Sequence, residues 1–210
     1  MRTDLLFATL TGFLLSFAYP PYKLGILAYW ALVPFFCLLE GKNPGSAFRW
    51  GYFTGIVVTI GALNTLALNS TTSLIVVLLF HPFYYSLYSV LHVLFCQKFG
   101  NRAVIFLPFI WVGMELVKGL NDFGFSDLNL GYTHPQYLIF FQTAAHWTSL
   151  LVSFWIFCLN LLIYGMLNNL RDRRKVAYLL ATTIALLIIP LCCGYRRLDI
   201  PDVFDLMVDL

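Results

Sequence analysis

The 210-residue chain is 60% hydrophobic and 18% aromatic but only 11% charged, with a mean hydropathy of +0.80. Soluble domains carry roughly 25% charged residues, so this composition excludes an ordinary soluble globular domain. The net charge of +3 is small, and the basic residues of the chain are grouped in the predicted loops and not on one face. This distribution argues against nucleic-acid binding.

Two long segments lack Asp, Glu, Lys and Arg altogether: Trp50–Gln97, of 48 residues, and Leu128–Leu170, of 43 residues. One membrane-spanning helix needs roughly 20 apolar residues, so each segment is long enough for two crossings, or for one crossing and a buried loop. The pattern predicts an all-α, polytopic integral membrane helix bundle.

Breaks at charges, Pro and Gly divide the chain into about seven transmembrane helices. A seven-helix domain over 1–195 is expected, followed by a short periplasmic tail over 196–210. Tyr19-Pro20-Pro21-Tyr22 cannot continue a helix and offers no small-residue cleavage site, so the first helix is predicted to be permanent and to form a hairpin with the second. Pro82, Pro108 and Pro190 fall inside helices and are expected to kink them. The predicted helices are 4–19, 24–40, 46–68, 72–97, 103–120, 143–169 and 176–194.

The distribution of basic residues predicts the orientation. With the N-terminus in the cytoplasm, nine of the thirteen Lys and Arg residues fall inside, and Arg171–Lys175 is the strongest cluster. Seven crossings then place the C-terminus in the periplasm. The inside set is Arg2, Lys42, Arg49, Lys98, Arg102, Arg171, Arg173, Arg174 and Lys175, and the outside set is Lys23, Lys118, Arg196 and Arg197.

Small residues at four-residue spacing indicate close helix packing. They occur at Ala8, Gly12 and Ser16, and again at Gly51 and Gly55. The five cysteines lie in apolar segments without metal-ligand spacing and are interpreted as small hydrophobic residues, so no metal site and no cofactor is predicted.

Polar residues within apolar helices are the informative positions, because they are costly in hydrocarbon. Trp111, Glu115 and Lys118 are spaced to share one helical face. They form either a polar notch facing a lipid headgroup or partner domain, or an interfacial pair that anchors the helix end. The spacing alone favours the anchor.

The connection from about Asn121 to Gln142 is too apolar for a free solvated loop. Irregular backbone at membrane depth must be buried in protein or line a cavity, so this segment is the best candidate for a substrate-facing surface, with a structural plug as the alternative. His81 and His92 share a predicted helix that contains no carboxylate, and the scattered histidines His81, His92, His134 and His146 are interpreted as structural. Asn64, Asn69 and Asn160 are expected to make interhelical hydrogen bonds.

Several motifs, taken in order, resemble the membrane domain of bacterial apolipoprotein N-acyltransferases over about residues 8–195. The matching positions are Phe17-Ala18-Tyr19-Pro20-Pro21, Gly25, Trp30, Leu32-Val33-Pro34, Ala47-Phe48-Arg49-Trp50-Gly51, Gly55, Trp111-x-x-x-Glu115-x-x-Lys118, Phe123-Gly124-Phe125, Leu130-Gly131-Tyr132, Gln142 and Asn160. The chain departs from the family pattern at Lys118, where Arg is usual, at Ser126-Asp127, where Pro-Trp is usual, and at Thr133-His134.

The resemblance implies acyl transfer from a phospholipid to the N-terminal cysteine of a diacylated lipoprotein at the outer face of the bacterial inner membrane. In that family a nitrilase-like domain carries a Glu-Lys-Cys triad for a ping-pong route. The 210 residues contain no such domain, so no catalytic residue is carried over, and the chain is expected to be half of a split enzyme, a truncated product or a relative without the chemistry. Whether it is an enzyme is left open. The resemblance implies that the lipid- or partner-facing candidates are Trp111, Glu115, Lys118, Phe123, Phe125, Tyr132 and Gln142.

On this basis the expected function is to bind lipid or lipoprotein and to dock a separate nitrilase-like catalytic domain. A small multi-pass transporter or a non-catalytic membrane scaffold is the alternative. A transporter needs a polar pathway, which only His81, His92 and Asn64 could line.

Overall fold

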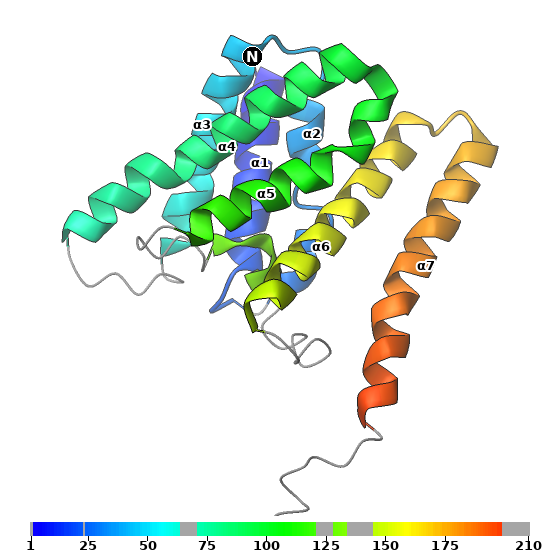
Figure 1. Cartoon of the computed structure of the whole chain (residues 1–210). Coiled ribbons are helices and arrows are strands. Elements are labelled where there is room, and N and C mark those ends of the chain that lie inside the picture. The colour runs from blue at the N-terminus through cyan, green and yellow to red at the C-terminus, as the bar shows by residue number, and fades with distance from the viewer. Residues whose placement is uncertain (1, 23, 64–70, 121–127, 134–144, 199–210) are drawn as a thin grey trace, which may run out of the picture.

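A computed structural model describes residues 2–22, 24–63, 71–120, 128–133 and 145–198. All regular structure in these residues is helical, as the sequence predicted, with seven α-helices and several 3₁₀ segments. The α-helices are α1 (Arg2–Ala18), α2 (Val33–Leu39), α3 (Pro44–Gly61), α4 (Thr71–Phe99), α5 (Leu107–Gly119), α6 (Ala145–Asn168) and α7 (Arg173–Leu198). Figure 1 shows α7 at the edge of the molecule, beside α6.

The second predicted helix, 24–40, is wrong as a single element. The structure splits it into a 3₁₀ segment, η1 (Gly25–Tyr29), and the seven-residue α2, which has Pro34 in its first turn. Asn160 of α6 satisfies the backbone at the break, because its Oδ1 accepts from Leu32 N at 2.8 Å and its Nδ2 donates to Ala28 O at 2.7 Å. Buried backbone polar groups need such partners, so a side chain remote in sequence makes the break possible.

The fifth predicted helix also begins later than expected. Residues Gly100–Ile105 form a 3₁₀ segment, η3, and α5 starts at Leu107 with Pro108 in its first turn. Pro108 therefore helps to start a helix instead of kinking one, since a proline at this position lacks only an N–H that would be unpaired anyway. Pro82 does lie inside α4.

Helices α3 and α4 cross closely at the Gly51-x-x-x-Gly55 pair. A Cβ built on Gly55 would lie 2.6 Å from Pro82 Cα, and one on Gly51 would lie 2.7 Å from Tyr85 O. Helix α1 packs against the same helix, α3, and Asn43 caps its start by accepting from Ser46 N at 2.8 Å. The small-residue spacing thus marks a real helix contact.

Aromatic side chains fill the centre of the bundle. Phe35 and Phe36 of α2 are fully buried, with Tyr88 of α4 and Phe157 of α6 against them. Cys37, Cys96 and Cys158 are free thiols and partly buried.

Two helical stretches of the described residues are long and apolar enough to cross a bilayer, Ile75–Ile105 and Ser149–Asn168. Length and composition alone therefore do not establish a seven-span bundle.

Candidate functional site

Helix α5 places Trp111, Glu115 and Lys118 on one buried face. Their spacing of four and three residues brings the side chains into register along the helix, as the sequence predicted. The three side chains are only 5%, 2% and 4% exposed. A charged face this deeply buried must be satisfied by partners within the protein.

Glu115 uses one carboxylate oxygen to join two segments. Oε1 accepts from Trp111 Nε1 at 2.8 Å and from the backbone N–H of Leu130 at 2.7 Å. Through these two bonds Glu115 holds the start of the 3₁₀ segment η5 (Leu130–Thr133) against α5. Oε2 has no hydrogen-bond partner among the described residues.

Lys118 binds the chain two residues before Leu130, at Leu128. Its Nζ donates to the carbonyl of Leu128 at 3.2 Å, and the hydroxyl of Tyr19, just after α1, donates to that carbonyl at 2.9 Å. The residues Leu128–Thr133, called the 128–133 segment below, are therefore held by charged and phenolic groups from two helical regions.

Helix α6 holds the other side of the 128–133 segment. The Gly131 N–H donates to Ser153 Oγ at 2.7 Å. A Cβ on Gly131 would collide with the backbone carbonyl of Ser149, so only glycine permits this close approach to α6. The segment is thus fixed between α1, α5 and α6.

Aromatic rings surround the buried charges. The Trp111 ring centroid lies 5.0 Å from that of Tyr88 and 5.7 Å from that of Tyr85, in edge-to-face arrangements. A cavity of about 10 Å³ lies beside Tyr84, Tyr85, Trp111, Met114, Glu115 and Lys118. That volume is roughly what one water molecule requires.

The interfacial anchor that spacing alone favoured for Glu115 and Lys118 is therefore wrong. Both side chains are buried, and no ion pair of the described residues joins them directly. Each instead binds the backbone of the 128–133 segment. The sequence could not show this, because the partners are main-chain atoms ten to fifteen residues farther along the chain.

The other candidates divide between described and undescribed residues. Tyr132 lies within η5 and is half-buried, between the fully buried Gly131 and Thr133. Phe123, Phe125 and Gln142 lie outside the described residues, as do Asn64, Asn69 and His134. The structure thus brings Trp111, Glu115, Lys118 and the backbone around Tyr132 together.

His81 and His92 each contact a hydroxyl group. His81 Nδ1 lies 2.7 Å from Thr59 Oγ1, and His92 Nδ1 lies 2.9 Å from the Tyr88 hydroxyl. Both rings are buried, which supports the structural interpretation over a polar pathway. Asn160 makes the interhelical bonds predicted for it.

Sequence reasoning from spacing missed Ser153 and Tyr19 as members of the site. Ser153 stands in an uncharged apolar helix without any distinguishing neighbour, so no local signal points to it. Tyr19 precedes the Pro20-Pro21 turn, and only its place in the resemblance motif singled it out.

Comparison with known proteins places most of the chain in one family. The sequence model of the apolipoprotein N-acyltransferase N-terminal domain matches residues 11–162. That range contains α5, the 128–133 segment and the part of α6 that carries Ser153.

Curated relatives agree with this match. The chain is 27% identical to an apolipoprotein N-acyltransferase of Geobacter metallireducens over 214 aligned residues, which cover 96% of this chain and 41% of that protein. It is 29% identical to apolipoprotein N-acyltransferase 1 of Treponema denticola, covering 68% of this chain and 27% of that protein. It is 30% identical to the enzyme of Chlorobaculum tepidum, covering 73% of this chain and 30% of that protein. The chain therefore spans less than half the length of each of these relatives.

Proposed function

Because this chain belongs to the apolipoprotein N-acyltransferase N-terminal domain family, we propose that it is the membrane domain of a lipoprotein N-acylation enzyme. In this proposal it binds a phospholipid or a diacylated lipoprotein and docks a nitrilase-like catalytic domain. The observation that carries the proposal is the fixed 128–133 segment, because it lies inside the family match and is held by the charged pair on α5.

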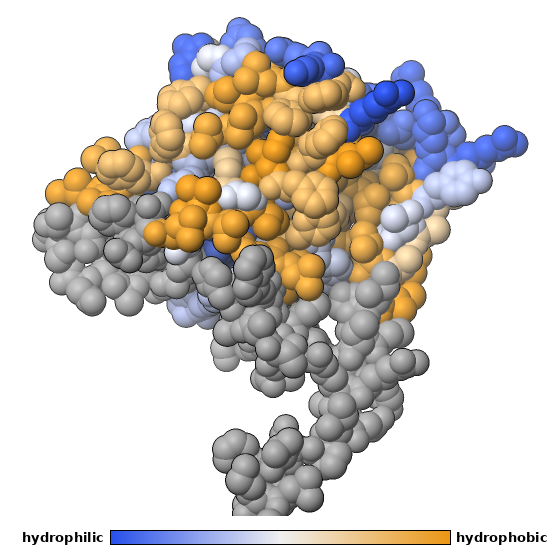
Figure 2. All heavy atoms as spheres, viewed as in Figure 1, coloured by the Kyte–Doolittle hydropathy of each residue, from blue (hydrophilic) through white to orange (hydrophobic). Residues whose placement is uncertain are grey.

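A location within the bilayer is supported by the outer surface. Large apolar side chains are exposed on many helices, among them Leu6, Phe13, Phe80, Phe109 and Ile184. Figure 2 shows hydrophobic residues across the middle of the visible face and hydrophilic residues along its upper edge. Soluble monomers rarely expose contiguous apolar surface on this scale, so we infer that lipid covers it.

We propose the bacterial inner membrane, with seven crossings, the N-terminus in the cytoplasm and the C-terminus in the periplasm. In Figure 1 the N-terminus and the turn between α6 and α7 lie at the same end of the bundle. Lys42 Nζ binds Asp4 Oδ1 at 2.7 Å, which joins the α2–α3 turn to the start of α1 at that end. A shared basic end fits the positive-inside rule.

The 128–133 segment then lies at the opposite, periplasmic side, where α5 ends. There we propose that Glu115 and Lys118 position the segment, while Tyr132 presents a half-buried ring to the substrate or the catalytic domain. Glu115 and Lys118 bind main-chain groups, so we assign them positioning roles and no catalytic step.

A binding assay tests this proposal. The full chain in lipid nanodiscs should bind a fluorescent diacylated lipopeptide saturably, and Tyr132→Ala should weaken binding about tenfold, as loss of an aromatic contact residue does. The melting temperature should stay unchanged, because Tyr132 is only half-buried.

The matched control is Tyr52→Ala, since Tyr52 is a half-buried tyrosine on the distant helix α3. That variant should bind like the parent. Equal binding by the parent and the Tyr132→Ala variant would remove Tyr132 from the proposed surface.

A further inference from the structure

A deep groove runs between α6, α7 and the start of α5, away from the 128–133 segment. Its volume is about 960 Å³, at the upper end of the range of ligand pockets. Helix α6 forms the floor with Phe154, Cys158, Leu161 and Leu162, and the two walls are η3–α5 and α7.

The lining of the α7 wall, from the mouth to the deep end, extends about as far as one leaflet of a bilayer. On α7 the lining runs from Lys175 to Leu186, which at 1.5 Å per residue is roughly 17 Å. Half of a hydrocarbon core of about 30 Å is roughly 15 Å, so the groove matches the depth of one acyl chain. Trp155 Nε1 donates to Leu186 O at 2.8 Å and ties α6 to α7 at the deep end.

The amide and ammonium groups of the lining gather at the shallow end. Asn101, Asn168, Asn169 and Lys175 line the mouth, beside the α6–α7 turn. The Asn169 amide donates to Gly165 O at 2.8 Å, whereas the side chains of Asn101, Asn168 and Lys175 are exposed. Amide N–H groups and an ammonium are the donors that a phosphate oxygen accepts from.

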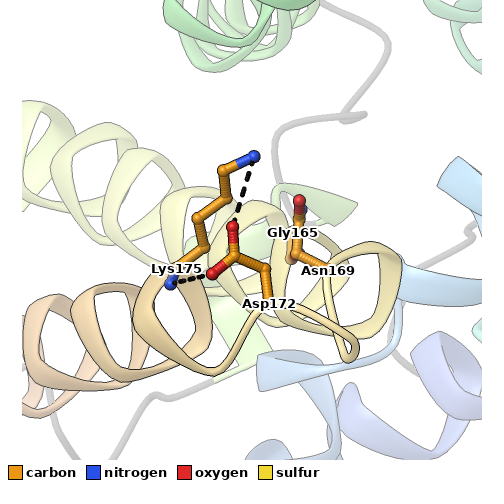
Figure 3. A network of polar contacts seen from close by, with 4 residues as sticks. All are labelled: Gly165, Asn169, Asp172 and Lys175. Carbon is orange, nitrogen blue, oxygen red and sulfur yellow. Dashed lines mark hydrogen bonds and ion pairs between the residues drawn. The ribbon is translucent and has the colours of Figure 1, made fainter.

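The mouth is basic, although Asp172 lies beside it and Glu40 lies near Tyr164 of the lining. Asp172 caps α7 by accepting from Lys175 N at 3.2 Å, and its other oxygen lies 3.7 Å from Lys175 Nζ (Figure 3). That pair is exposed, at 66% and 46% for the two side chains, so it constrains Lys175 little. Arg171, Arg173 and Arg174 stand on either side of Asp172.

We propose that this groove binds one anionic phospholipid from the leaflet at the basic end of the bundle. One of its two acyl chains lies along α6 between the two walls, and the phosphate contacts Lys175, Asn101 and Asn168. This inference rests on the proposed membrane location. It concerns the leaflet opposite the 128–133 segment, and so a site separate from the one proposed for the lipoprotein.

Native mass spectrometry of the full, delipidated chain tests the site. Phosphatidylglycerol should bind more tightly than phosphatidylcholine with the same chains, and Lys175→Gln should lower the phosphatidylglycerol affinity about fivefold, as expected for one basic residue near a phosphate. The control is Lys98→Gln, because Lys98 is an exposed basic residue at the same end that does not line the groove. This variant should change neither affinity.

A second pair of variants tests the apolar part. Leu162→Trp fills the groove floor and should lower the affinity for both lipids. Leu180 is 49% exposed on α7 and does not line the groove, so Leu180→Trp should leave both affinities unchanged. Equal binding of the two lipids by the parent, or equal effects within either variant pair, would overturn the proposal.

Alkaline extraction of membranes distinguishes a failure of the groove proposal from a failure of the proposed membrane location. A chain that is extracted from membranes contradicts the membrane location and the groove together. If the chain stays in the membrane but Lys175→Gln binds like the parent, only the groove proposal fails.

Discussion

Two buried charges on one helical face form the centre of the candidate site at the scale of single residues. Glu115 and Lys118 each bind a main-chain group of the 128–133 segment, and the Trp111 indole shares the Glu115 oxygen with Leu130. A helix end in a bilayer could anchor itself with exposed Lys and Trp alone. The burial of both charges therefore indicates that they hold one element in place.

We expect Glu115→Gln to destabilise the protein by about 1–3 kcal/mol, because the buried Lys118 loses the nearby negative charge and two hydrogen bonds lose a charged acceptor. The amide oxygen of Gln can still accept from Trp111 and Leu130, so the loss reports on charge. Thermal unfolding in detergent would measure it.

The double variant Glu115→Gln, Lys118→Met should recover much of that stability, since no charge then remains buried. It should still bind the lipopeptide poorly, because Met cannot donate to the Leu128 carbonyl and the 128–133 segment then loses one of its two bonds to α5. A melting temperature of Glu115→Gln within error of the parent would mean that the two charges do not support each other.

At the scale of elements, close contacts decide which helices meet. Helix α3 approaches α4 where Gly51 and Gly55 present bare backbone to Tyr85 and Pro82. Without side chains at these positions the two backbones come into direct contact, as they do in helix pairs that associate through van der Waals packing.

We expect Gly55→Ala to destabilise the protein by about 1–3 kcal/mol, because the new methyl group would lie 2.6 Å from Pro82 Cα and force the helices apart. Gly113→Ala is the matched control. A Cβ there meets nothing within 4 Å, so alanine should be neutral or slightly stabilising through its helix propensity. Unfolding in graded dodecyl sulfate would compare the two variants, and equal stabilities would show that the α3–α4 crossing tolerates a side chain.

Asn160 shows how one element can depend on another. It bonds to backbone on both sides of the break between η1 and α2, and it also donates to Ile156 O at 2.9 Å within its own helix. The short α2, with its fully buried Phe35 and Phe36, is therefore positioned by α6.

At the scale of the whole molecule, the basic residues and the apolar surface define a direction. The described basic turns lie at one end, and the 128–133 segment lies where α5 ends. This arrangement fits the proposed topology, in which the basic end faces the cytoplasm and the 128–133 segment faces the periplasm.

Seven crossings with a cytoplasmic N-terminus predict that a reporter enzyme active only in the periplasm, fused after Leu210, is active. A cytoplasmic reporter at the same site should be silent, and the reverse pattern should appear when the reporters are inserted after Leu170, in the α6–α7 turn. A silent periplasmic reporter after Leu210 would mean that the number of crossings is even.

The sequence by itself determined the helical class, the approximate places of the seven α-helices and the shared face of Trp111, Glu115 and Lys118. These features follow from local rules: apolar runs, helix-breaking prolines and the 3.6-residue period. It also predicted that Asn160 would bond between helices, because a buried amide must find a partner.

Only the tertiary structure decided what those residues touch. The break between η1 and α2 depends on Asn160 of α6, more than a hundred residues away, and the burial of Glu115 and Lys118 depends on the carbonyl of Leu128 and the N–H of Leu130. The groove forms where α6, α7 and the η3–α5 region come together, which no local pattern in the sequence indicates. Contacts between distant segments depend on three-dimensional packing, and main-chain partners carry no residue-specific signal in the sequence.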